Sequence, residues 1–269
     1  GTRAGFLAAL FLVLMPRYYG HAFNNPKDIP VAVSYLWGVY YVLRCVVAYP
    51  ALSRGLIVKT GLVIGAALSI RVGGLLLVFY LGAFLFLCWL RSNQRTGASF
   101  VLLVKWVLAT SAIAYGMTLV FWPYLQVHPI AEFWEAVQMF GAFPEVHFTF
   151  FEGIYVGSNE IPWYYAPKWL LLTLPEYVLI GVLLTVGIAL GKRRFKMSYL
   201  VLLVCALFPI VYAVVKQMPL YDGIRHLLFV MPPLAVISAL GMNYLLRMRK
   251  EIVWVTVGGM CVCVLFGVR

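Results

Sequence analysis

The stretch MSYLVLLVCALFPIVYAVVK, residues 197–216, decides the fold, because in about 20 residues its only charged side chain is the terminal Lys216. A helix of this length reaches across the hydrocarbon core of a bilayer, which is about 30 Å thick. Comparable apolar runs recur along the chain: 64% of its 269 residues are hydrophobic and only 11% are charged. Soluble domains carry roughly twice that charged fraction. The sequence therefore predicts an all-α, polytopic bundle of transmembrane helices.

Polar breaks divide the chain into about nine apolar segments of the kind that spans membranes. Only Arg71 and its neighbours separate two short segments, which suggests a tight hairpin. The longest connection, residues 125–165, is too short for a soluble domain, so residues 1–269 are predicted to form one membrane domain. The predicted segments are residues 1–15, 30–49, 56–70, 72–90, 100–124, 166–190, 197–216, 227–246 and 252–268.

The Lys and Arg residues between these segments predict the orientation. Alternation puts ten of them on one side and six on the other, and cytoplasmic loops carry such an excess. The net charge of +12 is then mainly a topology signal, and no nucleic-acid partner is expected. The cytoplasmic ten are Arg54, Arg91, Arg95, Lys192, Arg193, Arg194, Lys196, Arg247, Arg249 and Lys250; the outer six are Arg17, Lys27, Arg71, Lys168, Lys216 and Arg225.

Acidic residues and histidines gather on the outer side. Eight of the nine acidic residues lie there, and only Glu251 is cytoplasmic; all four histidines are outer as well. Chemistry or polar-ligand binding is therefore expected at the outer face. The five cysteines lie within apolar runs, so neither a disulfide framework nor a metal site is predicted. The outer acidic residues and histidines are Asp28, Glu132, Glu135, Glu145, Glu152, Glu160, Glu176, Asp222, His21, His128, His147 and His226.

The first polar outer element is PRYYGHAFNNPKDIP, residues 16–30. Pro16 is expected to end the preceding helix, and Asp28 is expected near the N-terminus of the next one, where the helix dipole favours a carboxylate. Two interpretations stay open. In one, Asp28 is a cap, and Lys27 and Arg17 extend toward the membrane surface. In the other, the dense polar groups form one wall of an active site.

The second element is the outer loop, residues 125–165, with the aromatic stretch that follows it. Residues 130–143 place Phe133, Val137 and Phe140 on one face, which predicts an amphipathic helix lying in the membrane interface. Downstream comes SNEIPWYYAPKW, residues 158–169. Its aromatic residues form either an interfacial belt or a wall for a sugar ring or lipid chain. They are Trp163, Tyr164, Tyr165 and Trp169.

The third element is QMPLYDGIRHLLFVMPP, residues 217–233. Arg225 is expected at the N-terminal end of a helix, where the dipole disfavours a cation, so an anionic partner is predicted. Asp222 is one candidate partner, and a phosphate group is the other.

Together these elements resemble the polytopic glycosyltransferases of the so-called C fold, most closely the protein O-mannosyltransferase and aminoarabinose transferase group. The resemblance rests on the order of motifs over nearly the whole chain. They are PRYYGHAFNNPKD (16–28), LSIRVGGLLL (68–77), WPYLQVHPIAEFWEA (122–136), IPWYYAPKWLLLTLP (161–175) and GIRHLLFVMPPLAV (223–236).

The resemblance implies inverting transfer of a sugar from a polyprenyl- or dolichyl-phosphate donor to a hydroxyl of a protein, lipid or glycan. The family's catalytic base lies in a first outer loop that is expected upstream of Gly1, so the chain is expected to be a fragment. Asp28 matches the supporting carboxylate, and Arg225 matches an arginine near the donor phosphate. A divalent metal ion is compatible with the carboxylates; no other cofactor is expected. The candidate substrate-binding residues are Arg225, His226, Lys27, Asn25, His21, Arg71, Tyr164 and Tyr165.

Two other function classes stay open. A secondary transporter or lipid flippase would carry ionisable residues near the bilayer midplane, where this chain has few, such as Arg44 and Lys105. A non-catalytic subunit of a glycosylation complex is the other. The expected location is a bacterial inner membrane or the endoplasmic reticulum, with the active face outward or luminal.

Overall fold

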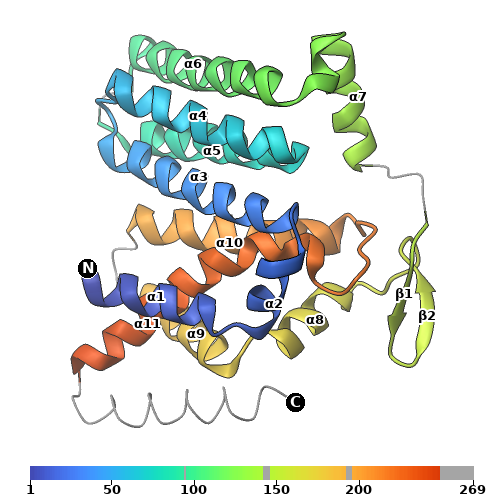
Figure 1. The fold of residues 1–269 in the computed structure, drawn as a ribbon. Coiled ribbons are helices and arrows are strands. Elements are labelled where there is room, and N and C mark those ends of the chain that lie inside the picture. Colours follow the sequence, from blue (N-terminus) through green and yellow to red (C-terminus); the bar gives the residue numbers. More distant parts are fainter. Residues whose placement is uncertain (94, 142–145, 192–195, 249–269) are drawn as a thin grey trace. The chain divides into compact units, whose positions relative to one another are not determined.

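The computed structural model describes residues 1–93, 95–141, 146–191 and 196–248. These residues are mostly helical (Figure 1). The chain divides into two compact units, Gly1–Ile29 with Val146–Arg269, and Pro30–Glu145.

Within its described residues the first unit contains six longer helices, one short 3₁₀ helix and a two-stranded hairpin. They are α1 (Thr2–Val13), α2 (Pro16–Asn24), β1 (Phe148–Phe151), β2 (Ile154–Gly157), α8 (Tyr165–Thr173), α9 (Glu176–Gly191), α10 (Met197–Val215), the 3₁₀ helix η3 (Arg225–Val230) and α11 (Met231–Met248).

The regular secondary structure in the described part of the second unit is all helical. Its helices are α3 (Asp28–Ala48), whose first two residues belong to the first unit, α4 (Arg54–Ile70), η1 (Val72–Gly74), α5 (Leu75–Arg91), α6 (Gly97–Phe121), η2 (Pro123–Gln126) and α7 (Pro129–Gly141).

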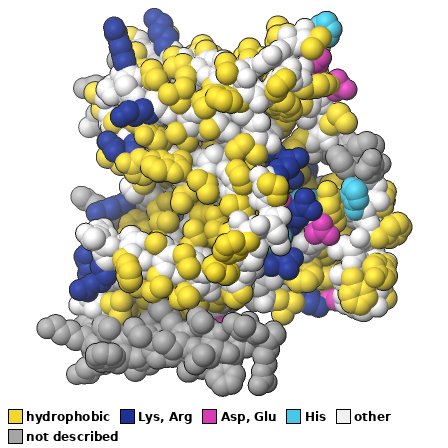
Figure 2. Space-filling model, viewed as in Figure 1, with side chains coloured by type: hydrophobic (Ala, Val, Ile, Leu, Met, Phe, Trp, Pro, Cys, Tyr) yellow, Lys and Arg dark blue, Asp and Glu magenta, His cyan; other side chains and the backbone are white. Residues whose placement is uncertain are grey.

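Five described helices are long and apolar enough to cross a membrane, and there are up to seven if each of two bent pairs is one span. This is consistent with a multi-pass membrane protein, and hydrophobic side chains cover much of the visible surface in Figure 2. The count of nine stays a prediction. Segment 56–70 falls in α4, which has 17 residues, and segment 252–268 lies outside the described residues. The five are Asp28–Ala48, Val72–Arg91, Gly97–Phe121, Met197–Val215 and Arg225–Arg247.

Prolines produce the two bends. The helix α1 ends at Val13, and Pro16 is the first residue of α2, so Pro16 starts a second helix at 69° to the first. Segment 166–190, predicted as one span, is α8 and α9 at 111°. Leu174 between them is extended, as the residue before Pro175 tends to be.

Small residues allow helices within each unit to pack closely. In the second unit, a Cβ on Gly61 would lie 2.9 Å from the carbonyl oxygen of Thr110, and one on Gly65 would lie 2.7 Å from that of Ala114. This glycine pair, four residues apart on α4, is the spacing that brings membrane helices together. In the first unit α9 and α11 are also close: a Cβ on Gly181 would lie 2.6 Å from the carbonyl oxygen of Ser238, and Thr185 Oγ1 donates to the carbonyl oxygen of Ile237 at 2.6 Å.

The prediction of an all-α chain is wrong at residues 148–157, where β1 and β2 form an antiparallel hairpin. Its two-residue turn, Glu152 and Gly153, has φ values of 53° and 87°. Positive φ at both positions is the type I′ turn, whose twist matches that of paired strands. Phe150 and Tyr155 are cross-strand partners with ring centroids 5.3 Å apart.

Where the sequence predicts a helix over residues 130–143, the structure has α7, Pro129–Gly141; residues 142 and 143 lie outside the described part. Phe133 and Val137 are half-buried, and Phe133 packs edge-on against Tyr115 with ring centroids 5.4 Å apart. Trp134 is 62% exposed. The place of α7 in the membrane interface stays a prediction.

Candidate functional site

An ion-paired cluster in the first unit joins two of the three polar elements. Arg225, the first residue of η3, donates from Nε to Oδ2 of Asp28 at 2.9 Å and from Nη1 to Oδ2 of Asp222 at 3.0 Å. Asp28 is only 2% exposed, whereas the side chain of Arg225 is 35% exposed. A carboxylate so deeply buried needs its partners, because an unpaired charge there would be costly.

Asn25 fixes the position of Asp28. Its Nδ2 donates to Oδ2 of Asp28 at 2.9 Å, and its Oδ1 accepts from the backbone N–H groups of Asp28, at 2.9 Å, and Lys27, at 3.3 Å. Asn25 thus caps the start of α3, where the helix dipole also favours the carboxylate. The ring of His21 lies against this group, with Nδ1 3.4 Å from Nδ2 of Asn25. The side chain of Lys27 is exposed.

A left-handed turn at Asp222 and Gly223 connects the cluster to the second polar element. These residues have φ values of 57° and 68°. The backbone N–H of Gly223 donates to the hydroxyl of Tyr165 at 3.1 Å, and Arg17 Nη2 donates to the carbonyl oxygen of Asp222 at 3.2 Å. A Cβ at Gly223 would lie 2.9 Å from Arg17 Nη2. Glycine therefore suits both the backbone conformation and the close approach of Arg17.

Arg17 keeps unused hydrogen-bonding capacity. Its guanidinium carbon lies 5.9 Å from the ring centroid of Trp169, a cation–π arrangement. Its Nε and the Nε1 of Trp169 are both buried, and neither has a hydrogen-bond partner among the described residues. Within that part of the chain no carboxylate forms an ion pair with Arg17. Sequence reasoning missed this role, although Arg17 stands in the motif PRYYGHAFNNPKD.

Two histidines flank a tyrosine beside the cluster. The ring centroid of Tyr221 lies 4.3 Å from that of His147 and 4.4 Å from that of His226. The candidate His226 therefore packs against an aromatic ring next to the Asp222 turn.

Tyr165 and Tyr164 have different surroundings. Tyr165 is 1% exposed and its hydroxyl also lies 3.3 Å from Thr149 Oγ1. Tyr164 turns to the hairpin, where its hydroxyl donates to Glu152 Oε2 at 3.2 Å. Glu152 also pairs with Lys168, and this hydrogen-bonded ammonium holds the pKa of the Glu152 carboxyl below its ordinary value.

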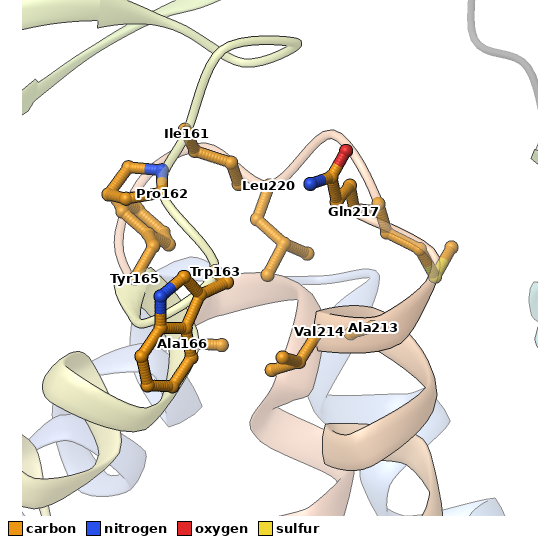
Figure 3. Close-up of a pocket in the computed structure, with 10 residues that line it drawn as sticks. Ile161, Pro162, Trp163, Tyr165, Ala166, Ala213, Val214, Gln217 and Leu220 are labelled. Carbon is orange, nitrogen blue, oxygen red and sulfur yellow. The ribbon is translucent and has the colours of Figure 1, made fainter.

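A small pocket lies beside Tyr165, between the start of α8 and the end of α10 (Figure 3). Its lining is mostly apolar, and its volume of about 10 Å³ leaves room for no more than about one water molecule. It includes Pro162, Trp163, Ala166, Val214, Gln217 and Leu220.

Most of the predicted site residues lie in this first unit. Arg71 is the exception: it follows α4 in the second unit, with an extended backbone, so its membership of the site stays a prediction. Among the described residues no group of three or more His, Cys, Asp or Glu side chains could hold a metal ion. The residues brought together by direct contacts are Asp28, Arg225, Asn25, His21 and, through Gly223, Tyr165; Lys27 adjoins them through its backbone.

Comparison with protein-family models, curated proteins and solved structures gives no match to this chain.

Proposed function

We propose that this chain is part of a membrane glycosyltransferase that uses a polyprenyl- or dolichyl-phosphate sugar. The observation that carries the proposal is the convergence of the polar elements. The ion pair of Asp28 and Arg225 joins the first element to the third, and Tyr165 and Trp169 of the second element contact the turn and Arg17. These are the elements on which the resemblance rests.

In the proposed reaction, an acceptor hydroxyl attacks the anomeric carbon of the donor sugar and the bond to the phosphate oxygen breaks. The phosphate keeps the electron pair, and a carboxylate base takes the hydroxyl proton. Negative charge grows on the leaving phosphate, so nearby N–H donors and cations lower the barrier. We assign this role to Arg17 and Lys27, because neither is ion-paired with a described residue.

Arg225 and Asp28 then act as positioning residues. Two carboxylates already occupy Nε and Nη1 of Arg225, so a bidentate grip on a phosphate would require breaking these bonds. The pair instead fixes the start of α3 and the Asp222 turn. The carbonyl oxygen of Asp222 accepts a hydrogen bond from Arg17, so the pair also positions Arg17.

Both rival classes make different predictions. A transporter or flippase would move the lipid or its headgroup without forming a glycosidic bond. A non-catalytic subunit would show neither transfer nor dependence on this cluster. The polar groups of the cluster lie at helix ends, at the start of α3 and before α11, which favours a surface reaction over a midplane transport site.

The test is sugar transfer by the full-length protein, reconstituted in lipid with polyprenyl-phosphate sugars and measured per mole of folded protein. Arg17→Lys keeps the charge but loses the Nε–H, and is expected to lower transfer about a hundredfold or more, the loss typical of one transition-state donor. Arg247→Lys, at the far end of α11, is the matched control and is expected to leave transfer unchanged.

Transfer that is normal in Arg17→Lys would remove Arg17 from the reaction. If no polyprenyl-phosphate sugar supports transfer and the protein moves lipid between leaflets, the flippase class would be favoured over the glycosyltransferase class.

A further inference from the structure

The β1–β2 hairpin exposes a surface of large apolar side chains. We define the hairpin surface as Phe148, Phe150 and Tyr155, which lie on one face and are 72%, 57% and 75% exposed. On the opposite face Thr149 and Phe151 are only 6% exposed, whereas Ile154, the cross-strand partner of Phe151 next to the turn, is 63% exposed. Figure 2 shows hydrophobic side chains over much of the hairpin, which lies beside α8 in Figure 1. Apolar groups gathered in this way mark a contact surface.

The hairpin carries little net charge. Among residues 148–157 the only ionisable side chains are Glu152 and Tyr155. Glu152 is paired with Lys168 and accepts a hydrogen bond from Tyr164. Lys168 also lies 5.3 Å from the ring centroid of Phe151. Neutralisation of the one carboxylate lowers the cost of bringing the hairpin next to lipid.

The hairpin is fixed to a helix that itself presents apolar side chains. The ring of Phe151 packs on Tyr165, the first residue of α8, with centroids 4.8 Å apart, and Thr149 contacts the same hydroxyl. Farther along α8, Leu171 and Leu172 are 63% and 68% exposed. In a membrane protein such helix faces are covered by lipid. The hairpin is therefore attached to a helix that has exposed apolar side chains of its own.

From these observations we propose that the hairpin surface inserts into the outer interface of the bilayer as a lipid anchor. The depth follows from the backbone. A two-stranded sheet has unpaired N–H and C=O groups along both edges, and these cannot be left in hydrocarbon. At headgroup level the edges remain hydrated while the aromatic rings enter the acyl boundary, where Tyr is favoured. This inference depends on membrane insertion and not on sugar transfer.

The test places spin labels on single-cysteine variants of the chain in lipid nanodiscs. Phe150→Cys and Tyr155→Cys report on the hairpin surface, Asn159→Cys reports on an exposed position just after the hairpin, and Leu183→Cys, on α9, reports on a 70% exposed apolar position. Labels at 150 and 155 are expected to be far more accessible to oxygen, which partitions into lipid, than to a water-soluble nickel chelate. The label at 183 should show the same pattern. Chelate access at 150 and 155 equal to that at 159 would overturn the proposal. It would indicate that the hairpin surface faces water and is open to a soluble partner.

A second measurement needs no variant. A phospholipid with a photoreactive group next to its headgroup is incorporated around the wild-type protein, and the adducts are mapped by mass spectrometry. Adducts within residues 148–155 support the anchor. Adducts confined to helices, with the hairpin peptide recovered unmodified, would refute it even if the cysteine variants fail to fold.

Discussion

Arg225 and Asp28 meet at 2.9 Å although they stand 197 residues apart in the chain. The pair is unequal. Asp28 is almost fully buried, whereas Arg225 is 35% exposed and has Asp222 as a second carboxylate partner. Replacing Arg225 and replacing Asp28 are therefore expected to lower the stability of the protein by different amounts.

We expect Arg225→Gln to destabilise the protein by about 3–5 kcal/mol, because it leaves a buried carboxylate without its cation. Asp28→Asn should cost less, since Arg225 keeps Asp222 and water. The double variant should recover part of the Arg225→Gln loss, which unfolding titrations in mixed micelles would measure. Strict additivity in the double variant would show that the pair contributes no coupling energy. Equal losses in the two single variants would contradict the unequal burial of the two partners.

Close packing of α4 on α6 predicts that replacing glycine by alanine has opposite effects on stability at Gly65 and Gly116. At Gly65 a methyl group would lie 2.7 Å from the carbonyl oxygen of Ala114, whereas at Gly116, in the C-terminal half of α6, it would meet nothing within 4 Å. Gly65→Ala should destabilise by about 1–3 kcal/mol through overpacking. Gly116→Ala should stabilise by up to about 1 kcal/mol through helix propensity.

The same unfolding titration compares the two variants. Stabilisation by Gly65→Ala would mean that α4 and α6 are farther apart than the structure shows.

The pairing of Glu152 with Lys168 makes the hairpin sensitive to acid. The Lys168 ammonium holds the pKa of Glu152 below its ordinary value of 4.5. A depressed carboxyl pKa adds stability that is present above 4.5 and is lost as the pH falls through the lowered value. Hydrogen exchange of residues 148–157, corrected for intrinsic rates, should therefore show less protection as the pH falls below 4.5. Glu152→Gln should remove this pH dependence; an unchanged profile in that variant would assign the effect to another group.

Topology can be tested by cysteine labelling, and the structure selects the positions. Ser158 is only 1% exposed, so its exposed neighbour Asn159 is the better outer reporter, and exposed Lys196 is the cytoplasmic one. Asn159→Cys should react with an impermeant maleimide in intact cells, and Lys196→Cys only after permeabilisation. The reverse pattern would place the Asp28–Arg225 cluster on the cytoplasmic side.

Local sequence patterns predicted the helical class and the bend at Pro16, but not the bend at Pro175. Apolar length alone identified the helices at 197–216 and 100–124, because burial in lipid depends mainly on composition. The break at Pro175 was missed because Leu170, Leu171 and Leu172 continue the apolar pattern up to it. A proline inside an apolar run signals a bend, but the direction of the next helix depends on packing.

The hairpin could have been predicted from the sequence, because residues 148–157 carry a pattern typical of two strands joined by a short turn. Glu152 and Gly153 stand between FTFF and IYVG, and a glycine-containing dipeptide between two such β-prone runs is typical of a two-residue hairpin. For the site, the density of polar groups pointed to Asp28 and Arg225 separately. Their direct contact could not be predicted, because nothing in either motif specifies its partner across 197 residues.

The distance along the chain between Asp28 and Arg225 has a consequence for biosynthesis. At about 5–20 residues per second, a ribosome needs roughly 10–40 s to synthesise the 197 residues that separate them. During that interval Asp28 has no Arg225 to pair with, and its charge must stay hydrated or bound to another group at the membrane surface. Nascent chains stopped before residue 225 should therefore be recognised by quality-control proteases, whereas chains released after η3 and α11 have emerged should survive.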